Sequence, residues 1–294
     1  MLSNKENVVI LSHRLRGFGK YESTIQSLKA AIDKNVEMVE FDTRHTIDNQ
    51  IIIYHDPIIR KKLIFKTIKK NTFSTISKFV KDAHPDYEIA TLDDFLKIIS
   101  KQKYMKFTID IKEADLLEKY YSLIKKYRLE KRVCITSWRP ETLIEFHKIN
   151  KNIRLNFSHV NFIGKPMLLI FLIRIFGYFL KIFNLFSQIT HYLVFVDKKN
   201  FNIFKERNRG YIIIHILTKP PQWQLLKVLK QSRGGVGFLL SNLNKTNLKI
   251  LKKMGLETRL FSIKSKKDFA IMEKFGYPEV VFSDNPDFVT KLLT

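Results

Sequence analysis

The sequence predicts an α/β fold, a TIM (β/α)8 barrel, from three observations. Short apolar runs with the composition of β-strands recur along the chain. Helical patterns, in which apolar residues return every three or four positions, separate these runs. The length of 294 residues suits a barrel of this kind. Because strands that alternate with helices form parallel sheet, residues 1–294 are predicted to be one barrel domain.

The predicted strands outnumber the eight positions of such a barrel. In chain order they are 8–11, 38–41, 51–54, 107–109, 133–135, 153–155, 192–196, 211–217, 236–240, 258–263 and 280–282. Amphipathic helices are expected between them, for example at 22–34 and 92–99. Some of the runs must therefore form hairpins, insertions or helices, and the sequence does not assign the surplus runs.

Residues 167–196 depart from this alternation of strands and helices because their apolar content is far higher, and an apolar helical insertion is predicted at about 165–191. From Arg174 to His191, its polar residues are alternately three and four positions apart. On a helix this spacing gives one narrow polar stripe and a wide face of Leu, Ile and Phe. Such a helix is typical of peripheral membrane association. Arg174 and Lys181 argue against a membrane span, and burial against the barrel is the remaining alternative.

The composition predicts a folded, basic protein. A 45% apolar content with 10 Gly and 8 Pro excludes wholesale disorder. The formal charge of +24 suits nucleic acid, an acidic membrane or a phosphate substrate, but solvated lysines in a biased composition explain it equally well. Cys134 lies in an apolar run and has no second cysteine to pair with, and the N-terminus lacks the apolar stretch of a signal peptide. These features predict a cytoplasmic setting.

Candidate metal ligands follow two of the predicted strands. Glu40 and Asp42 are two residues apart, so on a strand both side chains point to the same side. Two carboxylates aimed together bind a cation, and hard oxygen ligands select Ca²⁺ or Mg²⁺. A third carboxylate is expected from another strand, and Asp110 is the candidate.

Candidate catalytic and phosphate-binding residues lie close to these acids in the sequence. His13 and His55 each end an apolar run, which in a TIM barrel is the face that holds active sites. One neutral and one protonated histidine could transfer protons in opposite directions, and the sequence leaves their order open. Arg14 is expected to hold a phosphate oxygen, and Lys112, on the same face as Asp110, to contact phosphate.

In order and approximate spacing these motifs resemble the glycerophosphodiester phosphodiesterase family. The family's His-Arg, Pro-Glu-Asn-Thr, Glu-x-Asp and His-Asp motifs correspond to His13-Arg14, Tyr21-Glu22-Ser23-Thr24, Glu40-Phe41-Asp42 and His55-Asp56. Glu22 is either part of the site or a helix cap. Asp110-Ile111-Lys112 stands where the family has Glu-x-Lys, with an acid one methylene shorter. Trp138, in a Ser-Phe-like position, is expected to line the substrate entrance, and Ser283 to Pro286 resemble the closing Thr-Asp-x-Pro.

The resemblance implies metal-dependent hydrolysis of glycerophosphodiesters. A hydroxyl of the substrate's own glycerol attacks phosphorus, and water then opens the cyclic phosphate. The apolar insertion favours lysophospholipids as further substrates, in a lysophospholipase D-like reaction, and predicts peripheral membrane association through 167–191. Nucleic acid is not expected as a partner. Two alternatives stay open: an inactive barrel that serves as a basic membrane-binding module, and a related phosphodiesterase of phosphoinositide or sphingolipid headgroups.

Overall fold

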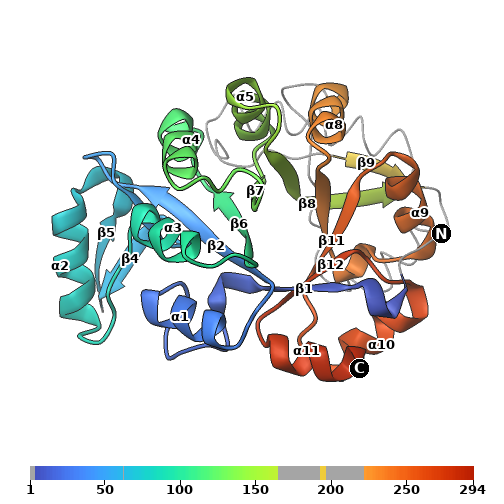
Figure 1. Ribbon diagram of the computed structural model, residues 1–294, viewed down its shortest axis with the longest axis horizontal. Helices are drawn as coiled ribbons and strands as arrows, with labels where there is room; N and C mark the ends of the chain where they lie inside the picture. The colour runs from blue at the N-terminus through green and yellow to red at the C-terminus, as the bar shows by residue number, and fades with distance from the viewer. Residues whose placement is uncertain (1–3, 62, 165–192, 197–221) are drawn as a thin grey trace.

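The computed structural model describes residues 4–61, 63–164, 193–196 and 222–294. Eight parallel strands form a closed barrel in these residues, and each pairs with the next along the chain (Figure 1). Closure comes from the first strand, which pairs with both the second and the last. The barrel strands are β1 (Val9–Ser12), β2 (Met38–His45), β6 (Lys106–Ile111), β7 (Val133–Ser137), β8 (Arg154–Gly164), β10 (Gly235–Leu239), β11 (Glu257–Phe261) and β12 (Val280–Ser283). The predicted TIM barrel is confirmed.

Helices surround this barrel on the outside (Figure 1). They are α1 (Ile25–Asp33), α3 (Leu92–Ser100), α4 (Leu117–Lys126), α5 (Pro140–Ile149), α8 (Gln222–Gln231), α9 (Lys245–Lys253), α10 (Lys266–Phe275) and α11 (Pro286–Leu293). Short 3-10 helices lie at Lys5–Asn7, His13–Leu15, Ile68–Lys70 and Leu240–Asn242.

Local sequence sets the beginning and the buried face of these helices. α3 begins with a capping box, in which the side chains of Thr91 and Asp94 each accept a hydrogen bond from the other's backbone N–H. Its apolar residues then recur at helical spacing and are buried against the barrel. α1 begins in the same way at Thr24, so Thr24 and not Glu22 caps that helix.

Three of the additional strands form an insertion between β2 and α3. β3 (Ile51–Ile53) pairs antiparallel with β2, and β4 (Ile58–Lys61) and β5 (Ile64–Thr67) form a separate two-stranded hairpin. This hairpin and α2 (Phe73–Ala83) lie together to one side of the helical ring (Figure 1). A small core of their own joins them to the barrel, and it comprises Ile52, Ile59, Ile68, Ile76, Phe79, Val80, Tyr87 and Ile89.

The remaining predicted segments are placed only in part. β9 (Leu193–Val196) pairs with the distal end of β8, outside the closed barrel. The predicted helical insertion at 165–191 and the predicted strand at 211–217 lie outside the described residues. Among the described helices, none combines the length and the apolar character needed to cross a bilayer.

An arginine fills part of the barrel interior. Arg259 on β11 is fully buried and donates to Glu257 at 2.7 Å and to Thr108 at 3.1 Å. It also donates to the sulfur of Cys134 at 3.3 Å, so the cysteine is a buried strand residue, as predicted. Burial alone would lower the pKa of Arg259, but Cys134 and Glu257 raise it, which keeps the charge in place.

Candidate active site

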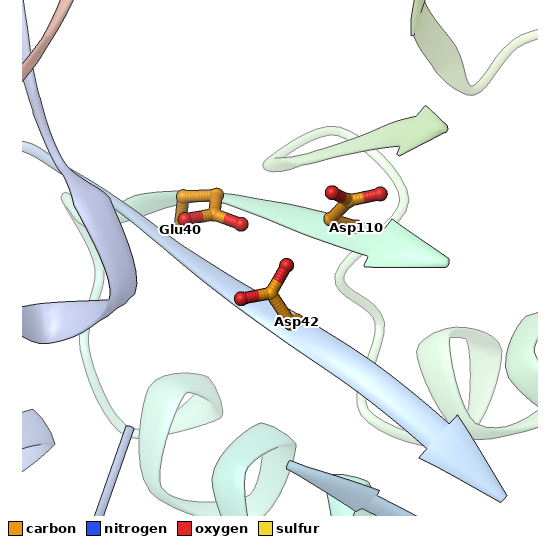
Figure 2. Close-up of side chains that lie close together, drawn as sticks. All are labelled: Glu40, Asp42 and Asp110. Atoms are coloured by element: carbon orange, nitrogen blue, oxygen red, sulfur yellow. The ribbon is translucent and has the colours of Figure 1, made fainter. Parts of the chain in front are cut away.

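Three buried carboxylates meet at the mouth of the barrel. Glu40 and Asp42 point inward from β2, and Asp110 points inward from β6 (Figure 2). The two strands are in register so that Asp42 lies beside Asp110 and Glu40 lies beside Thr108. One oxygen from each acid lies within 4.8 Å of the other two. The structure therefore brings the three predicted metal ligands together.

Two cationic side chains contact this cluster. The ammonium nitrogen of Lys112 lies 2.6 Å from an oxygen of Asp42 and 2.6 Å from an oxygen of Asp110. Nε of Arg14 lies 3.0 Å from the other oxygen of Asp42. Burial alone would raise the pKa of Asp42, but Lys112 and Arg14 outweigh it and lower the pKa to about 2. Asp42 is therefore ionised at every working pH.

The three acids of the cluster outnumber the two cations, and the other two acids have raised pKa values. The pKa of Glu40 is raised well above its ordinary value by burial first and then by Asp42 and Asp110. The pKa of Asp110 is also raised, chiefly by burial, and its Oδ1 is buried without a hydrogen-bond partner among the described residues. Three carboxylates against two cations, with Oδ1 of Asp110 and Oδ2 of Asp42 both buried without a hydrogen-bond partner among the described residues, fit a hard divalent cation.

The turn after β1 brings Arg14 and His13 to the acids. Arg14 and Leu15 have φ of 54° and 55°, a left-handed conformation that non-glycine residues adopt at a cost of about 1–2 kcal/mol each. In this turn the backbone N–H of Arg14 donates to Glu40 at 3.0 Å. Nε2 of His13 lies 4.0 Å from the same carboxylate.

The orientation of His13 is set from the far end of the chain. Its Nδ1 lies 2.7 Å from Oδ1 of Asp284, which directly follows β12. The hydrogen bond from His13 is the largest cause that lowers the pKa of Asp284 to about 2. The rings of Phe261 and Phe282 lie edge-on to the imidazole, with centroids 6.0 and 5.9 Å away. Nε2 is thus left as the ring nitrogen that faces the acids.

His55 approaches the same centre after β3. Its Nδ1 lies 2.6 Å from Oδ1 of Asp56, and its backbone carbonyl accepts a hydrogen bond from Nε of Arg44 at 2.7 Å. Burial is the largest effect on the pKa of His55 and lowers it below 6.5, while the nearby Asp42 acts in the opposite direction. His55 is therefore neutral at neutral pH.

Two further acids, Asp284 and Glu22, lie at the site. The sequence predicted no role for Asp284 and left open whether Glu22 belongs to the site or caps a helix. Glu22 contacts Arg14 at 3.5 Å and Arg16 at 2.5 Å, and Arg16 contacts Asp284 at 3.2 Å. This ion-pair chain connects the two arginines of the turn with the acid that holds His13. The position of Asp284, immediately after the last strand, was the signal that could have identified it.

An open cavity of about 370 Å³ adjoins these groups. Arg14, Glu22 and His55 belong to its lining. The rest of its lining is largely aromatic and apolar and includes Tyr21, Tyr54, Ile59, Val80 and Tyr87. The cavity is large enough for a small phosphodiester beside His55 and Arg14.

Trp138 lies elsewhere on the barrel. It follows β7 directly and is half-buried, with the guanidinium of Arg139 5.8 Å from its ring centroid. It is not part of the lining of the 370 Å³ cavity. A role for Trp138 at the substrate entrance stays a prediction.

Comparison with known proteins identifies the family of this chain. The family model described as "Glycerophosphoryl diester phosphodiesterase family" matches residues 11–163. The chain belongs to this family. As a glycerophosphodiester phosphodiesterase family member it is a phosphoric diester hydrolase, so the predicted family and enzyme class are confirmed. The matched range contains both histidines, Arg14, Lys112 and all three acids of the cluster, whereas Asp284 lies beyond it.

Two members of the family are similar to this chain in sequence. A glycerophosphodiester phosphodiesterase from Bacillus altitudinis is 25% identical over 170 residues, which are 53% of this chain and 69% of that protein. One from Caldanaerobacter subterraneus subsp. tengcongensis is 24% identical over 160 residues, 50% of this chain and 65% of its own length.

Solved structures share the fold over nearly the whole chain. A glycerophosphodiester phosphodiesterase from Parabacteroides distasonis has a TM-score of 0.65 and 18% identity, and the match covers 98% of this chain and 97% of that one. A phosphodiesterase from Oleispira antarctica, solved with the product sn-glycerol-3-phosphate, has a TM-score of 0.61 and 15% identity over 96% and 95% of the two chains.

Proposed function

We propose that this member of the family hydrolyses glycerophosphodiesters to an alcohol and glycerol 3-phosphate. The observation that carries the proposal is a cluster of three buried carboxylates that has His13 4.0 Å from Glu40 and lies close to a cavity lined by His55 and Arg14. A module that only binds phosphate needs cations, whereas a transfer reaction also needs groups that accept and donate protons. The family relationship and the product named for the Oleispira antarctica structure support the same substrate class.

The two histidines differ in a way that assigns their roles within this proposal. His55, whose pKa is lowered by burial, is the base that accepts a proton from the attacking glycerol hydroxyl. His13 is the acid: its Nδ1 contacts the ionised Asp284, and that carboxylate stabilises positive charge on the ring while Nε2 donates to the leaving alkoxide. The cyclic phosphate formed in this step is then opened by water.

Arg14 and Lys112 are the proposed phosphate contacts. Arg14 lines the cavity, and its guanidinium also contacts Glu22 and Asp42, so its planar fork is already held in one orientation. Lys112 lies between Asp42 and Asp110, where its charge keeps the two carboxylates close together. Movement of Lys112 from these acids toward phosphate is part of the proposal.

Glu40, Asp42 and Asp110 are the residues proposed to hold a Ca²⁺ or Mg²⁺ ion. All three are hard oxygen donors, which these two ions prefer. A divalent cation bound there would supply positive charge that stabilises the phosphoryl oxygens in the transition state. Asp110 is one carbon–carbon bond shorter than Glu, and its orphaned oxygen is available as a ligand without breaking a hydrogen bond.

Lysophospholipids are a further substrate class of the proposal. The sequence of residues 167–191, with one polar stripe and a wide apolar face, supports peripheral attachment of a cytoplasmic protein to a membrane. Substitution of Phe171, Phe179 and Phe183 by Ser tests this segment: loss of vesicle flotation is expected, and unchanged flotation would contradict the attachment through 167–191.

An alcohol-release assay tests the proposed reaction and its rivals together. Choline, ethanolamine and inositol release is measured from glycerophosphodiesters and lysophospholipids with Ca²⁺, Mg²⁺ or a chelator. Activity that needs a divalent ion and is lost in Asp110→Asn is expected. The control is Asp93→Asn, which removes an exposed carboxylate on α3 that pairs with Lys126.

The outcome separates the alternatives. Release only from phosphoinositide or sphingolipid headgroups would favour the related phosphodiesterase. No turnover on any diester, with an intact fold, would favour the inactive membrane-binding barrel.

A further inference from the structure

The tip of the β4–β5 hairpin exposes three consecutive apolar side chains. Leu63 is 98% exposed, Ile64 is 62% exposed and Phe65 is 66% exposed. Elsewhere in the described residues, the exposed large apolar side chains are Ile47 and Tyr104, which are not neighbours in the sequence. Scattered apolar residues are ordinary on protein surfaces, but a contiguous exposed group marks an interaction site.

The hairpin holds this tip in a fixed position. Strand pairing runs from Ile58 opposite Thr67 to Lys61 opposite Ile64, so Ile64 and Phe65 are paired residues of β5 and Leu63 directly precedes them. At its base, Ile59 and Ile68 are buried in the small core shared with α2. The tip is therefore displayed by a packed unit, and its apolar side chains stay exposed although Ile64 and Phe65 project to opposite faces of the ribbon.

Charge around the tip identifies its partner. Residues 58–83, which span the hairpin and α2, contain eight Lys and Arg residues and a single acid, Asp82. Arg60, Lys61 and Lys66 directly flank the apolar tip on its two strands. Apolar side chains at the tip with basic residues behind them match the surface of a bilayer. The apolar side chains would enter the boundary between headgroups and acyl chains, and the basic residues would contact anionic headgroups.

We propose that the β4–β5 hairpin inserts its tip, Leu63 to Phe65, into the surface of an anionic lipid bilayer. Contact with a second copy through this face would bring two units of like charge together, which opposes it. Nucleic acid would use the cations but leave the apolar tip without a partner.

Insertion of the tip would also orient the cavity. β4 begins three residues after His55, and Ile59 of β4 and Val80 of α2 line the 370 Å³ cavity. A protein held by this hairpin would have its cavity close to the headgroup region. This surface is separate from the catalytic groups, so lipid attachment and the proposed hydrolysis can each fail without the other.

Vesicle binding tests the proposal directly. The intact chain is floated with vesicles of phosphatidylcholine alone and of phosphatidylcholine mixed with phosphatidylglycerol. A triple variant, Leu63→Ser, Ile64→Ser and Phe65→Ser, is compared with Ile47→Ser, which removes an apolar side chain that is 61% exposed outside the hairpin. Binding to the anionic vesicles is expected to fall at least about 10-fold in the triple variant and to stay unchanged in the control.

A charge variant and two controls make the result decisive. Arg60→Gln with Lys61→Gln is expected to weaken anionic binding by about 5-fold for each charge removed. Thermal unfolding and hydrolysis of a water-soluble glycerophosphodiester are expected to stay at wild-type values in all variants. Wild-type vesicle binding by the triple variant would overturn the proposal. So would a self-association of the intact chain that the triple substitution abolishes without any vesicle binding.

Discussion

Replacement of Asp284 with Asn would remove a negative charge from the site while it keeps the size of the side chain. In the structure, Oδ1 of Asp284 lies 2.7 Å from Nδ1 of His13, and among the described residues no other acid contacts that nitrogen. The substitution therefore perturbs the orientation and the charge balance of His13 without altering a group that contacts the acid cluster directly.

The size of the effect follows from this contact. A hydrogen bond to a charged group contributes about 1.5–3 kcal/mol. Asp284 is 26% exposed and shares its charge with Arg16, so the lower half of that range applies. A loss of about 1.5–2 kcal/mol corresponds to a decrease of roughly 10- to 30-fold in kcat/KM. Because the pKa of Asp284 is about 2, the decrease should be constant from about pH 5 to 9.

Steady-state hydrolysis of a soluble glycerophosphodiester measures this decrease. Asp284 acts through His13 as a positioning residue, so the loss is expected in kcat with KM nearly unchanged. Asp287→Asn is the matched control, since Asp287 is an exposed acid three residues further on that pairs with Lys34 at 2.7 Å. A kcat/KM for Asp284→Asn within about two-fold of wild type would refute the assigned role of Asp284.

Three further predictions concern the metal, the pH profile and the packing. Added Ca²⁺ or Mg²⁺ should raise Tm more at pH 8 than at pH 5, because the raised pKa of Glu40 keeps this ligand protonated in acid. The substitution Asp110→Asn should abolish this rise in Tm. An equal rise in the variant would contradict metal binding by the three acids. In a plot of kcat/KM against pH, the decrease on the acid side should have its midpoint below pH 6.5, because burial lowers the pKa of His55. A midpoint above pH 6.5 would argue against His55 as the base. Gly234→Ala should lower the free energy of unfolding by at least about 1–3 kcal/mol in urea titration, because its Cβ would overlap the carbonyl oxygen of Leu155.

Much of the site was predictable because its signals are local. Residues two apart on a strand point the same way, so Glu40 and Asp42 had to share a face once β2 was identified. The same rule placed Lys112 beside Asp110. His13 ends a barrel strand, so the rule that active sites lie at the C-terminal end of a barrel placed it correctly. The same argument was wrong for His55, because β3 is not a barrel strand: it runs antiparallel to β2 and returns the chain to Asp42, whose backbone carbonyl accepts a hydrogen bond from the backbone N–H of Tyr54.

The extra strands and the exposed hairpin tip were not predictable, since composition does not show which neighbour a strand pairs with. Residues 51–53 have the same apolar character as a barrel strand but pair antiparallel with β2. Leu63, Ile64 and Phe65 have the composition of buried residues, and only the pairing of β4 with β5 shows that they are exposed.

The sequence by itself determined the alternation of strands and helices, and with it the shared face of Glu40 and Asp42 on β2 and of Asp110 and Lys112 near the end of β6. The tertiary structure alone decided which distant residues meet. Asp284 reaches His13 across 271 positions because β12 pairs with β1 when the barrel closes. Side-chain periodicity is a property of a few neighbouring residues, whereas closure depends on the packing of the whole barrel, and no local pattern records it.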